Sequence, residues 1–315
     1  MMGKLHDLVE FKNHLLDQLD YLSLDKSIQD KIESLEKTKR IFPPQDDFCT
    51  KTINDFLLIK QQSQKVIYNI VNKISVLDLE IDSVAASLFD NHEYQNNFHE
   101  HQIQEPEFKN SLILSAELES AIISKITQYS DWHYPALQIN PRNKKWIDPM
   151  VASDPLYLTH YNLDIVKEII KPYPNLYQNR LRLYETMDRD FSKLPQAQFS
   201  FVLCWDYFNY LSPVFVEKYI RDVHRLLRPG GCFMFSYTNC DLIGSALRAE
   251  SWACAYASAR WLRKMCLEIG YEIDDLVDHE TGDAFNTHVS WAILKKSGIL
   301  NTVKAAQAMA EIKYK

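Results

Sequence analysis

The distribution of glycine constrains this chain more than any other feature of its sequence. The chain has 7 glycines among 315 residues, and none lies between Gly3 and Gly230. A loop that cradles a phosphate or a nucleotide needs glycine, which adopts positive φ without strain and lets a ligand touch the bare backbone. The first two-thirds of the chain therefore contain no glycine-rich nucleotide-binding loop.

The length and composition indicate a soluble globular protein. With 46% hydrophobic and 24% charged residues, the chain is long enough for two domains, or for one domain with a long extension. No stretch approaches the roughly 20 uninterrupted apolar residues of a membrane helix, and the first residues lack the apolar core of a signal peptide. We therefore expect a cytoplasmic protein without a membrane partner.

Charge and cysteine usage exclude two further classes. The formal net charge of −7 gives no bulk attraction to nucleic acid, and no basic stripe with interleaved aromatic residues is present. The six cysteines form no CxxC pair and lie in apolar or mixed surroundings, so neither a disulfide framework nor a zinc site is expected. Two groups of histidines and acids, in residues 91–104 and 278–288, lack regular ligand spacing, and we expect no metal site.

Residues 1–130 have the pattern of a helical region. Apolar residues recur at spacings of three and four, and we expect helices at about residues 5–41, 53–88 and 107–129. The second of these carries apolar residues at two positions of a heptad: Ile53, Ile67, Ile74, Ile81 and Leu88 at one, and Phe56, Ile70, Leu77 and Val84 at the other. Such a seam lets helices wind around each other, within one chain or between chains. We favour pairing with a second copy, or with another protein in a larger assembly.

The composition changes at Trp132, where short aromatic and β-branched runs begin to alternate with helical stretches. This alternation predicts a parallel sheet with crossover helices over residues 131–298, followed by a C-terminal helix in residues 299–315. The expected strands are at about residues 136–139, 156–159, 180–186, 200–205, 232–237, 271–277 and 289–294. The expected helices are at about residues 149–153, 163–170, 213–227, 244–250, 257–269 and 301–313.

One segment of this second region is typical of a known family. Residues 225–231 read RLLRPGG and are followed by the apolar run CFMF, so a helix ends and a buried strand begins at a tight turn. With its surrounding elements, the chain from about residue 132 to 296 resembles the class I S-adenosylmethionine-dependent methyltransferases, in particular the type-11-like branch. The resemblance implies a Rossmann-like sheet of seven strands, with the last strand antiparallel, and S-adenosylmethionine as cofactor. It also implies that Asp190, four residues before Leu194-Pro195, accepts a hydrogen bond from the adenine amino group.

The chain departs from the family pattern in the cofactor loop. Gln138 stands where the family has an acid, and Asn140 and Arg142 stand where it has glycines. After the second strand, His160 or Asn162 replaces the acid that usually holds both ribose hydroxyls. The cofactor would therefore lose two negative partners and meet side chains where it usually meets backbone.

Two hypotheses follow from these departures. In the first, Arg142, Lys144 and Lys145 form a cationic loop for the cofactor carboxylate, while His160 or Asn162 holds a ribose hydroxyl. In the second, the sheet is retained for its packing, and the protein is a catalytically inactive scaffold that acts through its N-terminal helices. The sequence does not identify a methyl acceptor.

Candidate catalytic residues follow the fourth expected strand. Asp206 could accept a proton from an attacking nucleophile and Asn209 could orient an amine, because the carboxyl ends of parallel strands open onto the substrate crevice. Tyr207, Phe208 and Tyr210 would wall an apolar pocket. The acid or Asn followed by two prolines and an aromatic residue, typical of amino-methyltransferases, is absent. Methylation of DNA bases is therefore disfavoured.

Overall fold

The structure is a computed structural model that describes residues 4–22, 25–41, 46–89, 114–186, 191–250, 255, 257–280 and 288–297. The chain divides into two compact units, Met1–Asn91 and His92–Lys315. The expected C-terminal helix, the His-rich segment and Asp190 lie outside the described residues. Within the described part of the chain, no helix is long and apolar enough to cross a membrane.

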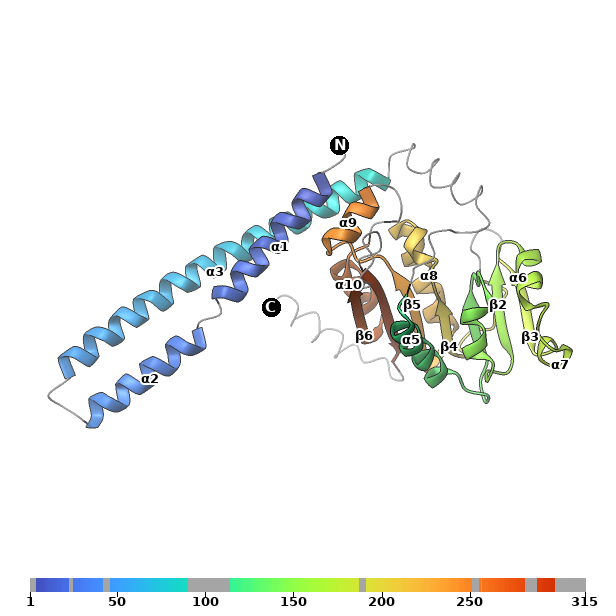
Figure 1. The fold of residues 1–315 in the computed structure, drawn as a ribbon, viewed down its shortest axis with the longest axis horizontal. Helices are drawn as coiled ribbons and strands as arrows, with labels where there is room; N and C mark the ends of the chain where they lie inside the picture. Colours follow the sequence, from blue (N-terminus) through green and yellow to red (C-terminus); the bar gives the residue numbers. More distant parts are fainter. Residues whose placement is uncertain are drawn as a thin grey trace. The chain divides into compact units, whose positions relative to one another are not determined.

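The first unit is a set of three helices (Figure 1). Its helices are α1 (Lys4–Leu22), α2 (Asp25–Ile41) and the long α3 (Asp46–Phe89). The single helix expected over residues 5–41 is thus wrong, because α1 and α2 are separate. Each of them packs on α3: Leu15 of α1 lies in one cluster with Ile70 and Leu77. A hydrogen bond of 3.1 Å from Lys60 Nζ to Gln29 Oε1 joins α2 to α3.

The heptad seam of α3 faces the helices of its own chain. Ile70, Leu77 and Ile81 are buried, and Lys12 of α1 lies 3.0 Å from Asp78 in a largely buried ion pair. The seam is therefore covered within one chain, at least where α1 and α2 contact α3. Because these seam residues are buried, they leave no apolar surface there for a second copy to cover.

The second unit contains a sheet of seven strands in the order β3-β2-β1-β4-β5-β7-β6 (Figure 1). The strands are β1 (Ala136–Ile139), β2 (Leu156–His160), β3 (Leu181–Glu185), β4 (Phe199–Cys204), β5 (Leu227–Tyr237), β6 (Tyr271–Glu280) and β7 (His288–Lys296). Strands β1 to β5 are parallel, and β7 runs antiparallel to both of its neighbours. The expectation of a last antiparallel strand inside a Rossmann-like sheet is confirmed.

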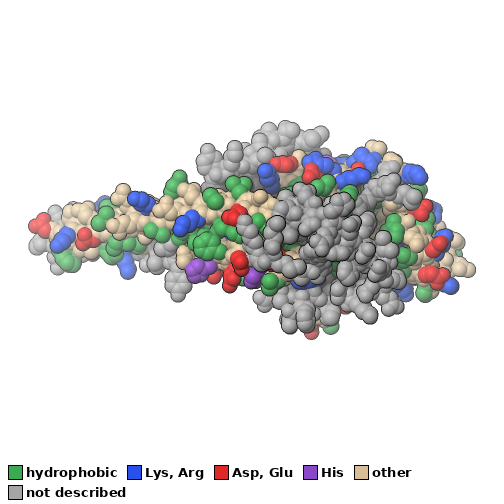
Figure 2. All heavy atoms as spheres, turned by 90° about the horizontal axis from the view of Figure 1, so that it is seen from above, with side chains coloured by type: hydrophobic (Ala, Val, Ile, Leu, Met, Phe, Trp, Pro, Cys, Tyr) green, Lys and Arg blue, Asp and Glu red, His purple; other side chains and the backbone are tan. Residues whose placement is uncertain are grey.

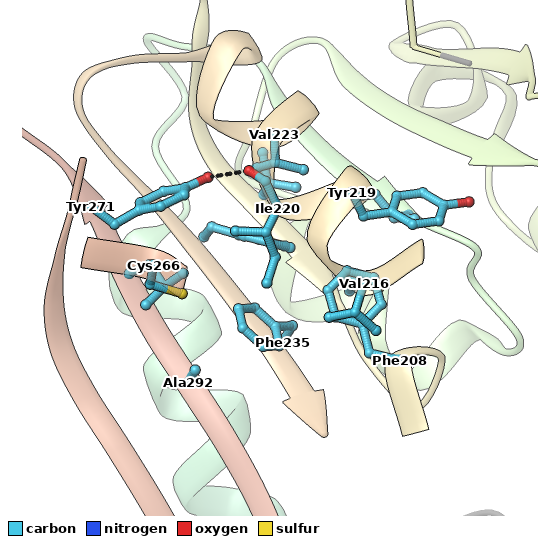
Figure 3. Close-up of a cluster of buried hydrophobic side chains, with 14 of the residues drawn as sticks. Phe208, Val216, Tyr219, Ile220, Val223, Phe235, Cys266, Tyr271 and Ala292 are labelled. Atoms are coloured by element: carbon cyan, nitrogen blue, oxygen red, sulfur yellow. Dashed lines mark hydrogen bonds between the residues drawn. The ribbon is translucent and has the colours of Figure 1, made fainter. Parts of the chain in front are cut away.

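Helices cover both faces of this sheet. On one face, α8 (Pro213–Leu226) and α10 (Ala259–Ile269) pack on the aromatic side chains of β5. Figure 3 shows Phe235 and Phe208 beneath Val216 and Ile220, and the Tyr271 hydroxyl donating a 3.0 Å hydrogen bond to the carbonyl of Ile220. The other face is covered by α5 (Ala116–Tyr129), η2 (Lys144–Trp146), η3 (Asp148–Met150) and α6 (Leu163–Ile170).

Helix α5 belongs to the sheet unit. Leu118, Ile122 and Ile126 are buried against it, and the ring of Tyr129 stacks on Phe201 of β4 with centroids 5.7 Å apart. The boundary expected at residue 130 therefore differs from the contacts, which place α5 with the sheet. Helical periodicity alone could not separate a helix of the extension from a helix that covers a sheet.

The RLLRPGG segment turns directly from α8 into β5. The helix ends at Leu226 and the strand begins at Leu227, five residues earlier than expected, with a register shift opposite Phe199. Gly230 has φ 76°, and a Cβ on Gly231 would lie 2.7 Å from the carbonyl oxygen of Phe199. The remaining elements are α7 (Asn175–Gln178), η5 (Phe208–Tyr210) and α9 (Ile243–Glu250).

Candidate cofactor site at the carboxyl edge of the sheet

The carboxyl ends of β2, β1, β4 and β5 lie next to one another, because these four strands are parallel and adjacent. In open sheets of this kind, ligands bind in the crevice beyond these ends. The chain here places a set of buried polar side chains, among them Gln138, Asn140, His160, Asp206 and Asn209. Buried polar groups normally have hydrogen-bond partners, so a buried group without one marks a place where a ligand could bind.

The turn after β1 contains no glycine, but one of its residues has a backbone conformation that favours glycine. Asn140 has φ 50°, in the left-handed region, and its amide donates a 2.7 Å hydrogen bond to the carbonyl of Thr159 on β2. Asparagine tolerates this region better than most residues. The Oδ1 atom of Asn140 and the Oε1 atom of Gln138 are both buried and accept no hydrogen bond. Two acceptors without donors thus lie at the end of β1.

Arg142 joins this turn to the one after β4. Its Nη1 lies 3.8 Å from Oδ2 of Asp206, and its guanidinium carbon lies 4.8 Å from the ring centre of Tyr210. The two lysines of the expected cationic loop have other partners. Lys145 forms an ion pair of 2.5 Å with Glu119 of α5, and Lys144 lies 3.7 Å from Asp148. Arg142 alone of the three is paired with a residue of the β4 turn.

His160 ends β2 as a buried, neutral imidazole. Burial, with the charge of Arg142 nearby, lowers its pKa to about 4. Its Nδ1 accepts a 2.9 Å hydrogen bond from the amide of Asn162, so the neutral ring carries its proton on Nε2. Asn162 is exposed, and its Oδ1 accepts from the amide of Asp164 as the N-cap of α6. Of the two candidates for a ribose contact, His160 is the buried one.

Asp206 and Asn209 are both held by Ser236 of β5. The Ser236 hydroxyl accepts a 2.7 Å hydrogen bond from the amide of Asp206 and donates one of 3.0 Å to Oδ1 of Asn209. The Nδ2 atom of Asn209 donates to the hydroxyl of Thr238 at 3.2 Å. Both polar atoms of the Asn209 side chain thus form hydrogen bonds to protein groups. The role of Asn209 in orienting an amine stays a prediction. Ser236 was not singled out from the sequence, because a serine inside an apolar strand gives no signal of its partners.

The carboxyl of Asp206 is buried, and two cations act on it. Burial raises its pKa to about 6, while Arg142, a hydrogen bond from Tyr210 and the charge of Arg248 act in the opposite direction. Its backbone has φ 54°, another non-glycine residue in the left-handed region. Left-handed residues persist where the surrounding structure holds them, here through the bond to Ser236. The position of Asp206 is therefore fixed, and its charge depends on pH near neutrality.

A family model described as a methyltransferase domain matches residues 119–276, which is half of the chain, and the chain belongs to this family. The methyltransferase resemblance is thus confirmed, while the type-11-like branch stays a prediction. No protein with a curated description matches the sequence.

Three of the solved structures to which this chain is similar are methyltransferases with low sequence identity. The N-methyltransferase NodS of Bradyrhizobium japonicum WM9 is 13% identical, with 64% of this chain and 98% of that one covered and a TM-score of 0.48. Geranyl diphosphate C-methyltransferase of Streptomyces coelicolor A3(2) is 12% identical, with 57% and 79% covered and a TM-score of 0.46. An S-adenosylmethionine-dependent methyltransferase of Mesorhizobium loti is 12% identical, with 56% and 97% covered and a TM-score of 0.45.

Proposed function

We propose that this protein binds S-adenosylmethionine at the carboxyl edge of its sheet and acts as a methyltransferase. The observation that supports the proposal best is the pair of buried, unpartnered oxygens of Gln138 and Asn140. An unpaired buried acceptor costs free energy, and the α-ammonium group of the cofactor supplies N–H donors that would satisfy both. The residues at the end of β1 therefore fit this ligand, although no acid neutralises the ammonium as in the family.

The other contacts follow from the state of each group. The Nε2–H of neutral His160 donates one hydrogen bond to a ribose oxygen, where the family has an acid that accepts two. Arg142 attracts the cofactor carboxylate, and Asp190 holds the adenine amino group, as the resemblance implies. When bound, the cofactor supplies a methyl group on a positively charged sulfur. Asp206 would take the proton of the methyl acceptor, whose identity is open.

Binding of the cofactor tests this proposal. We expect measurable affinity of the purified protein for S-adenosylmethionine and S-adenosylhomocysteine by calorimetry. Gln138→Leu should weaken both by roughly 10- to 100-fold, since one hydrogen bond to a charged group is lost. Gln198→Leu makes the same change at an exposed position before β4, at the opposite edge of the sheet, and should leave affinity unchanged. Dissociation constants weaker than millimolar for both ligands would exclude the proposal.

A second proposal concerns assembly through α3. Leu57, Tyr68 and Leu79 are 47%, 65% and 69% exposed, and their spacing of 11 residues places them on one face of the helix, away from the seam. Figure 2 shows hydrophobic side chains on the surface of the helical unit. The residues that continue this face, at positions 61, 65, 72, 76 and 83, include one charge, that of Lys65. We infer that this face pairs with a second copy, because a nearly uncharged stripe meets itself without repulsion.

Light scattering tests the assembly. A dimer should form at micromolar concentration, and Tyr68→Glu with Leu79→Glu should dissociate it. Glu80→Gln, at a neighbouring position that the stripe does not include, is the control and should stay dimeric. A monomeric unmodified protein would exclude self-association through this face.

A further inference from the structure

The carboxyl ends of β1 and β4 and the turns that follow them carry three buried acceptor oxygens that accept no hydrogen bond. They are Oε1 of Gln138, Oδ1 of Asn140 and Oδ1 of Asp206. Strands β1 and β4 are paired, with Gln138 opposite Leu203, so Gln138 near the end of β1, and Asn140 and Asp206 just after β1 and β4, lie at one edge of the sheet. Only the third oxygen belongs to a group that can carry charge. Unpartnered acceptors at a buried edge point to a ligand that brings donors or positive charge.

Two cations favour the charged form of Asp206. Arg142 is paired with it from the β1 turn, and Tyr210 of η5 and Arg248 of α9 also favour its charged form. Cys204 of β4 is buried with its pKa raised, so its thiol is neutral. Helix α9 also carries Glu250, which is buried. In the turns after β1 and β4, the described residues thus include one buried anion, Asp206, and one partly buried cation, Arg142.

We propose that Asp206 is the counter-charge that lets this site hold a positively charged sulfur beside Arg142, and so sets the preference for S-adenosylmethionine over S-adenosylhomocysteine. This inference rests on the proposed function and gives Asp206 an electrostatic role in addition to that of a base. The two ligands differ by one methyl group and one positive charge. A group that acts through charge must therefore affect their affinities unequally.

The expected size follows from the low dielectric of a buried edge. Two unit charges a few ångströms apart in a partly buried site interact strongly enough to change affinity by about tenfold or more. Without the carboxylate of Asp206, the sulfonium would lose its counter-charge, while the uncharged thioether would be little affected. Protonation of Asp206 near its pKa of about 6 should have the same effect as its replacement by asparagine.

Calorimetry with both ligands tests the inference. At pH 7.5, Asp206→Asn should weaken S-adenosylmethionine about tenfold or more and S-adenosylhomocysteine less than about threefold. Arg142→Gln should shift the ratio of the two dissociation constants in the opposite direction, and the double variant should return it toward the unmodified value. Asp164→Asn, which removes an exposed carboxylate on α6, is the control.

A pH titration of the unmodified protein gives a second test that needs no substitution. Between pH 7.5 and 5, the preference for S-adenosylmethionine should fall in the unmodified protein and stay constant in Asp206→Asn. Equal weakening of both ligands by Asp206→Asn, with a ratio independent of pH, would overturn the inference and leave the proposed function standing. Failure of the unmodified protein to bind either ligand would overturn both.

Discussion

Arg142 and Asp206 connect two turns that lie 64 positions apart in the sequence, with 3.8 Å between Nη1 and Oδ2. Each follows a parallel strand, and the adjacency of β1 and β4 brings them together. The pair places the carboxylate of Asp206 at the edge where a ligand would bind. It also makes the stability of the unit sensitive to pH.

Asp206 and His160 should affect stability in opposite directions. The pKa of Asp206 is raised from 3.8 to about 6, so the folded protein holds a proton that the unfolded chain releases. This group contributes about 3 kcal/mol more to the free energy of unfolding below pH 3.8 than above pH 6, and the contribution falls as pH rises. The pKa of His160 is lowered from 6.5 to about 4, so its contribution rises with pH between these values.

Urea denaturation between pH 4 and 7 should separate the two groups. Asp206→Asn should leave a stability that rises with pH in this range, and His160→Gln one that falls, whereas the two opposite contributions nearly cancel in the unmodified protein. The same slope in both variants would show that neither group titrates as its burial requires.

Ser236→Ala should destabilise the sheet unit by about 1 to 3 kcal/mol. The change removes the partner of two buried groups, the amide of Asp206 and Oδ1 of Asn209. Ser200→Ala is the matched control in the neighbouring strand, because its hydroxyl makes one long contact of 3.4 Å to Pro135. Chemical denaturation compares the two, and an equal loss would contradict the central place of Ser236.

The two glycines of the α8 to β5 turn should respond differently to alanine. In Gly231→Ala the new Cβ meets the Phe199 carbonyl at 2.7 Å and the Arg228 carbonyl at 3.0 Å, both backbone atoms, so the strands must shift. In Gly230→Ala the new Cβ meets no atom within 4 Å. This substitution should lower the free energy of unfolding by only about 1 kcal/mol, because alanine adopts positive φ less easily than glycine. Thermal denaturation should rank Gly231→Ala as the more destabilising, and the reverse order would contradict the close approach to Phe199.

Neighbouring leucines of α1 test the covered seam. Leu15 is 4% exposed and packs with Ile70 and Leu77, whereas Leu16 is 41% exposed. Leu15→Ala should cost about 2 to 5 kcal/mol in the helical unit, and Leu16→Ala less than about 1 kcal/mol. Circular dichroism during thermal unfolding measures both. Similar losses would mean that α1 does not pack on the seam.

Much of the sheet was predictable from local patterns. The apolar runs at residues 136–139 and 199–204 and the amphipathic stretch of α6 marked their elements within about one residue, because side-chain periodicity follows directly from backbone geometry. The antiparallel direction of β7 came from the family resemblance. The family pattern also identified Gln138, Asn140, Arg142 and His160 as departures.

The partners of these residues required the tertiary structure. Periodicity leaves open which distant segments are in contact. It therefore could not tell whether the α3 seam packs on its own chain or on another, or whether α5 packs on the extension or on the sheet. The sequence by itself determined, to within about one residue, where β1, β2, β4 and β5 end, and which residues there are polar. Only the fold decided that Ser236 holds both Asp206 and Asn209, and that Arg142 lies beside Asp206 while Lys144 and Lys145 do not. The reason is that hydrogen bonds and pKa values depend on distances of a few ångströms, which the packing of neighbouring strands sets.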